Sequence, residues 1–132
     1  MWKNMSKAMV VDDSRTIRMI LRRILTEIGF DVCEAGDGVE ALQIIEANKP
    51  NVTLVLADWN MPTMNGFDLL KQLRLNPEYA SLKIVMVTTE AEVGHMASAL
   101  HAGANEYVMK PFTKEILVQK LEMIGITSPA SV

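Results

Sequence analysis

Residues 52–58 have the sequence VTLVLAD, in which six mostly apolar residues lead directly to the carboxylate of Asp58. A strand that is apolar on both faces is typical of the centre of a parallel sheet, because helices cover it on both sides. This stretch therefore predicts an α/β domain that holds Asp58 rigidly at the carboxyl end of a buried strand.

Three further apolar runs in the chain also end in polar groups. They are 8–11 followed by Asp12 and Asp13, 84–87 followed by Thr88, and 107–109 followed by Lys110 and Pro111. If all four runs are parallel strands, these groups converge at one edge of the sheet, where open α/β sheets bind ligands. Such an edge suits a divalent cation beside a nucleophilic carboxylate, with an ammonium to neutralise an incoming phosphoryl group.

Helical patterns alternate with the strands. Ser14 is expected to cap a helix with an apolar stripe that ends before Gly29, and its arginines fall off that stripe into solvent. The stripe is Ile17, Ile20, Leu21, Ile24, Leu25 and Ile28, and the arginines are Arg15, Arg18, Arg22 and Arg23. Further strands are expected at 30–35, 83–87 and 106–109, and further helices around 39–46, at 66–75, at 91–102 and, capped by Thr113, up to about 124. This alternation predicts a parallel sheet with right-handed crossovers.

Length and composition indicate one globular domain over residues 6–126, with an N-terminal extension at 1–5 and a flexible tail at 127–132. The net charge of −3 gives no reason to expect a nucleic acid or a membrane as partner. No apolar stretch approaches the roughly 20 residues that span a bilayer. The lone Cys33 excludes an internal disulfide, favours a reducing compartment and is expected to be an inert thiol in the core. We therefore expect a cytoplasmic protein.

Six short motifs, each at the proper end of its element, together resemble the receiver domains of two-component response regulators, especially the single-domain chemotaxis type. These motifs are 11–14 (VDDS), 37–42 (DGVEAL), 57–62 (ADWNMP) with Asn65-Gly66, 88–91 (TTEA), 102–104 (AGA) and 107–112 (YVMKPF). The resemblance covers nearly the whole chain. It implies a flavodoxin-like fold, a doubly wound five-stranded parallel sheet of strand order 2-1-3-4-5.

The resemblance also implies the chemistry of the edge. Asp58 becomes the phosphoacceptor, and a Mg²⁺ ion, with Mn²⁺ as a substitute, is held by Asp13, Asp58 and the backbone carbonyl of Asn60, and by Asp12 partly through water. Taken alone, Asp12 and Asp13 fit equally well a role in which their charges merely stabilise the N-terminus of the following helix. Three facing carboxylates would, however, raise one another's pKa unless a cation lies between them.

The roles of the remaining site residues also follow from the resemblance. Lys110 stabilises the transferring group and precedes a cis bond to Pro111. Thr88 donates its hydroxyl to a phosphoryl oxygen, and Tyr107 changes rotamer with it, so that the two form a switch. Taken alone, Thr88 suits a strand end and Lys110 suits an exposed turn.

Asn60 and Glu90 match the chemotaxis type at the two positions that flank the attacking water, so they are expected to tune dephosphorylation. The protein then catalyses its own phosphorylation and dephosphorylation without being a multiple-turnover enzyme. Two departures stand out: Thr89 replaces a small residue, and helix four opens with 92–94 (EVG) where basic residues are expected of a regulator that docks a flagellar motor protein.

The expected partners are a histidine kinase or phosphotransfer protein and a downstream target, such as a flagellar motor switch. The target is expected to bind helix four, strand five and helix five. The protein itself is expected to be a monomer. A phosphate sink or phosphorelay intermediate without a target fits the same residues.

Two other classes of protein are less compatible with this sequence. A flavodoxin-like electron carrier would have its flavin phosphate repelled by Asp12 and Asp13, and a haloacid-dehalogenase-type phosphatase requires an Asp-x-Asp arrangement after the first strand.

Overall fold

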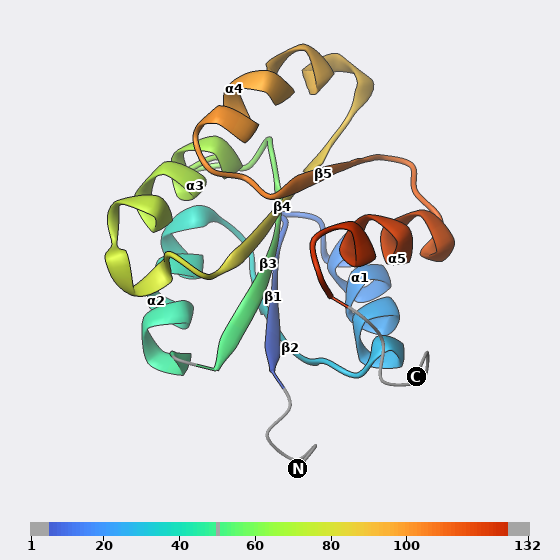
Figure 1. Ribbon diagram of the computed structural model, residues 1–132, viewed down its shortest axis with the longest axis horizontal. Coiled ribbons are helices and arrows are strands. Elements are labelled where there is room, and N and C mark those ends of the chain that lie inside the picture. Colours follow the sequence, from blue (N-terminus) through green and yellow to red (C-terminus); the bar gives the residue numbers. More distant parts are fainter. Residues whose placement is uncertain (1–5, 50, 127–132) are drawn as a thin grey trace.

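The computed structural model describes residues 6–49 and 51–126, except for the side chains of Glu90, Ala91 and Val93. Strands and helices alternate along this part of the chain (Figure 1). The elements are β1 (Lys7–Val11), α1 (Arg15–Ile28), β2 (Asp31–Ala35), α2 (Gly38–Asn48), β3 (Val52–Asp58), α3 (Gly66–Leu75), η2 (Pro77–Tyr79), β4 (Lys83–Thr88), η3 (Glu90–His95), α4 (Met96–His101), β5 (Glu106–Met109) and α5 (Lys114–Met123). The extension at 1–5 and the tail at 127–132, predicted from the sequence, lie outside the described residues.

The five strands form one parallel sheet in the order β2-β1-β3-β4-β5, as predicted. Every residue of β3 except Thr53 is buried, and so are the last four residues of β1. The apolar runs are therefore central strands covered on both faces, and the reversal of strand order falls between β1 and β3. These two neighbouring strands end at Val11 and Asp58.

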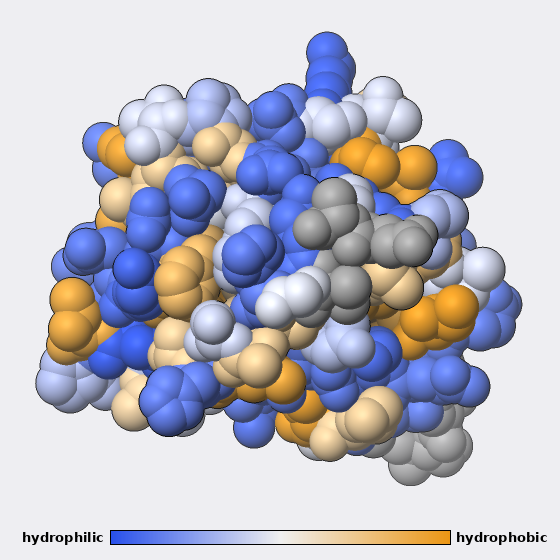
Figure 2. Space-filling model, turned by 90° about the horizontal axis from the view of Figure 1, so that it is seen from above, coloured by the Kyte–Doolittle hydropathy of each residue, from blue (hydrophilic) through white to orange (hydrophobic). Residues whose placement is uncertain are grey.

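Helices cover both faces of the sheet (Figure 1). One core packs α1 and α5 against the sheet through Leu21, Leu25 and Leu117. The other core contains residues of α2, α3 and α4, among them Ile45 and Leu70. Seen from the α4 side, the surface is mostly hydrophilic, and its apolar residues form separate patches (Figure 2). Within the described ranges, no helix is long and apolar enough to cross a membrane.

The face of α1 differs in two places from the predicted stripe. Ile20 belongs to the spacing pattern but is 45% exposed. Arg18, expected in solvent, is half-buried because its Nε donates to Glu34 at 3.0 Å and its Nη1 donates to the carbonyl oxygen of Asp12. Spacing alone places both residues wrongly, since the width of the buried face depends on how the helix lies on the sheet.

Helix four is also different from the prediction. The single helix expected over 91–102 is a 3₁₀ segment, η3, followed by the short α4, which begins only at Met96. Gly94 lies near the end of η3, and glycine weakens an α-helix by up to about 1 kcal/mol relative to alanine. Open space surrounds the position that a Cβ of Gly94 would occupy. The first turns after β4 are therefore 3₁₀ rather than α-helical.

Cys33 is half-buried rather than fully in the core, and its Sγ contacts the carbonyl oxygen of Ala8 at 3.9 Å. Burial raises the pKa of the Cys33 thiol above its usual value. A thiol that stays protonated is a poor nucleophile, in agreement with the inert role expected from the sequence.

Candidate phosphoryl-transfer site

The end of β3 holds Asp58 in a fixed position. Asp58 is only 6% exposed, and the next backbone N–H, that of Trp59, donates to the carbonyl oxygen of Val87 on β4 at 3.0 Å. A Cβ at Gly66 would overlap the carbonyl oxygen of Asp58, so only glycine allows the loop to fold back this closely. The N–H of Gly66 closes the loop by donating to the carbonyl oxygen of Trp59 at 3.0 Å.

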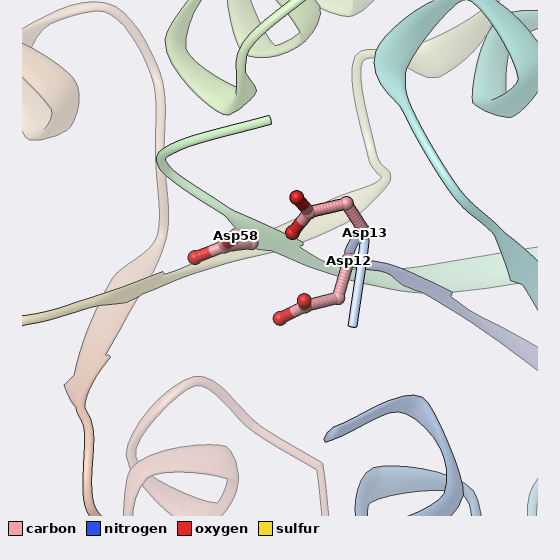
Figure 3. A group of neighbouring side chains, drawn as sticks. All are labelled: Asp12, Asp13 and Asp58. Carbon is pink, nitrogen blue, oxygen red and sulfur yellow. The ribbon is translucent and has the colours of Figure 1, made fainter. Parts of the chain in front are cut away.

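The end of β1 places two more carboxylates beside Asp58. Asp12 is 1% exposed, and its Oδ1 accepts a hydrogen bond from the N–H of Ser14 at 2.8 Å, whereas Asp13 is exposed. One oxygen from each of Asp12, Asp13 and Asp58 lies within 4.8 Å of the others (Figure 3). The convergence expected from the strand ends is thus present in the structure.

Lys110, which follows β5, completes this group. Its Nζ lies 3.1 Å from Oδ2 of Asp12 and 3.2 Å from Oδ1 of Asp58. The bond from Lys110 to Pro111 is cis, as the resemblance implied. Burial tends to lower the pKa of Lys110, but the hydrogen bond to Asp12 and the charges of both aspartates outweigh it and raise the pKa. Lys110 is therefore a firmly protonated cation beside both carboxylates.

Asp58 titrates differently from an ordinary aspartate. Its burial and the charge of Asp12 raise its pKa to about 6, against the opposing effect of Lys110. Two carboxylates so close to each other repel, and a single ammonium does not neutralise three acids. At neutral pH Asp58 is still mostly ionised, but at a cost in free energy that a bound cation would relieve.

The donor set suits a hard divalent cation. Mg²⁺ prefers oxygen ligands, keeps several waters and binds through one or two carboxylates together with phosphate oxygens. Asp13 is exposed and Asp58 nearly buried, so the group opens to solvent on one side. Burial and the charges of Asp12 and Asp13 raise the pKa of Asp58, and a bound cation would stabilise its ionised carboxylate, so this chemistry fits the expected ion.

Thr88 and Tyr107, the predicted switch pair, lie on neighbouring strands. Thr88 is fully buried, and its Oγ1 lies 3.2 Å from the carbonyl oxygen of Thr89. Tyr107 is half-buried, and Nζ of Lys120 lies 4.6 Å above the centre of its ring. The structure thus brings both residues to the β4–β5 side of the sheet, but the hydroxyl of Thr88 contacts its own loop.

The two residues expected to tune dephosphorylation are described unequally. Asn60 is exposed at the mouth of the site, whereas the side chain of Glu90 lies outside the described residues. Trp59 is half-buried between two rings, that of Phe67 at 5.2 Å and that of His95 at 5.7 Å between centroids. The indole therefore connects the loop after β3 with the segment after β4.

Glu92 is a residue that we did not assign to the site from the sequence. Its carboxylate accepts hydrogen bonds from Asn60, Thr88 and Thr89. Burial tends to raise its pKa, but the hydrogen bonds from Thr89 and Thr88 and the charge of Lys110 hold the pKa below its usual value. The spacing Thr89-x-x-Glu92 is that of a capping box, in which the glutamate side chain reaches back to the backbone N–H of the capping residue. This spacing predicts that the Glu92 carboxylate lies near the end of β4.

Comparison with known proteins agrees with this geometry. The family model of the response regulator receiver domain matches residues 8–122. The chain is 44% identical to chemotaxis protein CheY1 of Helicobacter pylori, with 89% of this chain and 95% of the relative covered, and 46% identical to the chemotaxis protein CheY homolog of Campylobacter jejuni, with 88% and 89% covered. The solved structure of chemotaxis protein CheY4 from Vibrio cholerae superposes with a TM-score of 0.83 at 33% identity, covering 91% of this chain and 98% of the other.

Proposed function

This chain belongs to the response regulator receiver domain family, and we propose that it is a response regulator that accepts a phosphoryl group on Asp58. One observation carries the assignment of the residue: Asp58 contacts the ammonium of Lys110 at 3.2 Å and lies within 4.8 Å of two further carboxylates. A receiver needs this combination of a nucleophilic carboxylate, a cation-binding group and a fixed positive charge.

The proposed donor is a phosphohistidine of a sensor kinase or of a phosphotransfer protein. An oxygen of the Asp58 carboxylate attacks phosphorus, an O–P bond forms, and the N–P bond breaks so that its electron pair stays on the imidazole. Lys110 stabilises the charge on the transferring oxygens, since positioning and electrostatics supply most of the catalysis in phosphoryl transfer. Hydrolysis of the acyl phosphate by water, tuned by Asn60 and Glu90, returns the free carboxylate.

The proposed cofactor is Mg²⁺. Asp13, Asp58 and the backbone carbonyl of Asn60 would hold it, with Asp12 partly through water. When bound, the ion neutralises carboxylate and phosphoryl charge. The observed crowding of Asp12, Asp13 and Asp58 supports this assignment, because it raises the pKa of Asp58.

Phosphorylation would act on the surface formed by α4, β5 and α5. Thr88 would donate to a phosphoryl oxygen, and Tyr107 would change rotamer with it, a two-state change biased by the charge on Asp58. This surface exposes Leu100, Met109 and Ile116 by 42–44%, side chains suited to a protein partner. The relatives are named as chemotaxis proteins, and the flagellar motor switch expected from the resemblance would be a target of that kind.

Phosphorylation by a small donor tests the proposal. We expect acetyl phosphate to add one phosphoryl group to the wild type in the presence of Mg²⁺, and none to Asp58→Asn, because the amide is not a nucleophile. Intact mass spectrometry measures the addition, and omission of Mg²⁺ should prevent it.

The matched control is Asp31→Asn, which makes the same chemical change at an exposed aspartate at the start of β2. It should be phosphorylated like the wild type. Metal-dependent addition of a phosphoryl group to Asp58→Asn would contradict the assignment of Asp58.

A further inference from the structure

A carboxylate from the segment after β4 reaches across the mouth of the acidic site. Oε1 of Glu92 accepts hydrogen bonds from the N–H of Thr89 at 3.0 Å and from its hydroxyl at 2.8 Å. Oε2 of Glu92 accepts a hydrogen bond from Nδ2 of Asn60 at 2.5 Å. Glu92 thus joins the loop that follows Asp58 to the loop that follows Thr88.

The hydroxyl of Thr88 is engaged by the same arrangement. Its Oγ1 lies 3.4 Å from Oε1 of Glu92 and 3.2 Å from the carbonyl oxygen of Thr89. A hydroxyl donates one proton, and both of these acceptors belong to the segment after β4. Thr88 is therefore unable to donate to a group on Asp58 until it turns away from them.

The negative charge of Glu92 also opposes a phosphoryl group on Asp58. A phosphoryl group on Asp58 would be an anion that requires the positive charge of Lys110 and the hydroxyl of Thr88. Glu92 already accepts a hydrogen bond from the hydroxyl of Thr88, and the charge of Lys110 lowers the pKa of Glu92. Two anions that require the hydroxyl of Thr88 exclude each other, through repulsion as well as through competition for that hydrogen bond.

The segment that carries Glu92 is able to withdraw at small cost. It belongs to η3, and 3₁₀ hydrogen bonds have poorer geometry than those of an α-helix. Gly94 and His95, which follow Glu92, are exposed. Movement of Gly94 and His95 would therefore break mainly the contact between the rings of His95 and Trp59.

We propose that Glu92 is an internal competitor of the phosphoryl group. In the unphosphorylated protein its carboxylate engages Thr88 and Asn60, and it has to leave before Thr88 can bind a phosphoryl oxygen. Glu92 acts through these residues, so it is a positioning residue that sets how readily Asp58 is modified. This inference rests on the proposed function of Asp58.

Binding of beryllofluoride, a stable analogue of the phosphoryl group, tests the role of Glu92. Isothermal titration calorimetry in excess Mg²⁺ should show about tenfold tighter binding to Glu92→Ala and about threefold tighter binding to Glu92→Gln than to the wild type, the size expected for loss of a competing hydrogen bond. Glutamine keeps a carbonyl oxygen for the N–H of Thr89 but loses the charge. Its melting temperature should therefore stay close to that of the wild type, so that tighter binding reports competition rather than a change in folding.

The matched control is Glu78→Gln, which removes the same charge from η2, at the opposite edge of the sheet. It should bind beryllofluoride like the wild type. Binding to either Glu92 variant that is equal to or weaker than that of the wild type would overturn the role of Glu92. A wild type that binds no beryllofluoride would instead contradict the proposed function itself, so the two failures are distinguishable.

Discussion

The amino edge of the sheet, where its strands begin, and the carboxyl edge, where they end, hold their charges in opposite environments. At the amino edge, Nζ of Lys49 lies 2.9 Å from each of Glu46 and Glu78, whose side chains are about 60% exposed. At the carboxyl edge, Lys110 is the cation that contacts Asp12 and Asp58, and both of these carboxylates are nearly buried. Water solvates the charges of the first group, whereas the protein itself has to stabilise those of the second.

This difference indicates where the molecule gives up stability for function. The carboxylates at the amino edge are exposed, and surface ion pairs contribute little to folding. The carboxyl edge concentrates three acids around one ammonium, which raises the pKa of Asp58. Natural proteins contain interactions that destabilise the fold mainly at their functional sites. We therefore expect substitutions at the two edges to have very different effects.

The largest effect is expected for Lys110→Ala. Removing this cation leaves Asp12 and Asp58 buried without their partner, and breaking a buried ion pair costs several kcal/mol. Protonation of Asp58 will relieve part of this cost, so we expect a loss of about 2–4 kcal/mol. Urea unfolding at pH 7.5 without Mg²⁺ measures it. A loss no larger than that of Lys49→Ala would show that the two edges do not differ.

A smaller effect of opposite sign is expected for Asp58→Asn. The amide removes one of the repelling charges, and a pKa of about 6 in place of 3.8 corresponds to a stabilisation of about 1–3 kcal/mol at pH 7.5. The measurement is again urea unfolding without Mg²⁺, with Asp31→Asn as control. A variant less stable than the wild type would contradict the repulsion inferred here.

The advantage of Asp58→Asn should also depend on pH. The folded state binds the Asp58 proton more tightly than the unfolded chain, so this group makes the wild type less stable as pH rises from about 4 to about 6. Asparagine does not titrate. The difference between the two proteins should therefore be small near pH 4 and complete above about pH 6.5, and a constant difference would point to another cause.

The smallest effect is expected for Lys49→Ala. Its partners Glu46 and Glu78 remain in water after the substitution, and exposed ion pairs contribute little. The midpoint of urea unfolding should be unchanged within experimental error. A clear shift would mean that the amino edge also depends on its charges.

Much of the fold was predictable from local patterns. The apolar runs of β1, β3 and β4 were placed to within a residue, because a strand buried on both faces leaves a continuous apolar signal. The predicted bounds of α3, Gly66–Leu75, were confirmed. The 3₁₀ conformation of η3 was not predicted, because weak local preferences leave that choice to the surroundings.

The site was predictable in part. The convergence of Asp12, Asp13, Asp58 and Lys110 followed from the strand ends, and the resemblance to receivers supplied the expected roles. The contact of Glu92 with Asn60 was not predicted, since these residues come from different loops. A capping-box spacing indicates where Glu92 turns back but does not reveal which other loop lies within its reach.

The sequence by itself determined the alternation of elements and the polar group at the end of each strand, since both depend on neighbours in the chain. The tertiary structure alone decided the 3.1 and 3.2 Å contacts of Lys110, the raised pKa of Asp58 and the position of Glu92. Charge interactions depend steeply on distance and burial. Both quantities are set only when strands and loops from distant parts of the chain pack together.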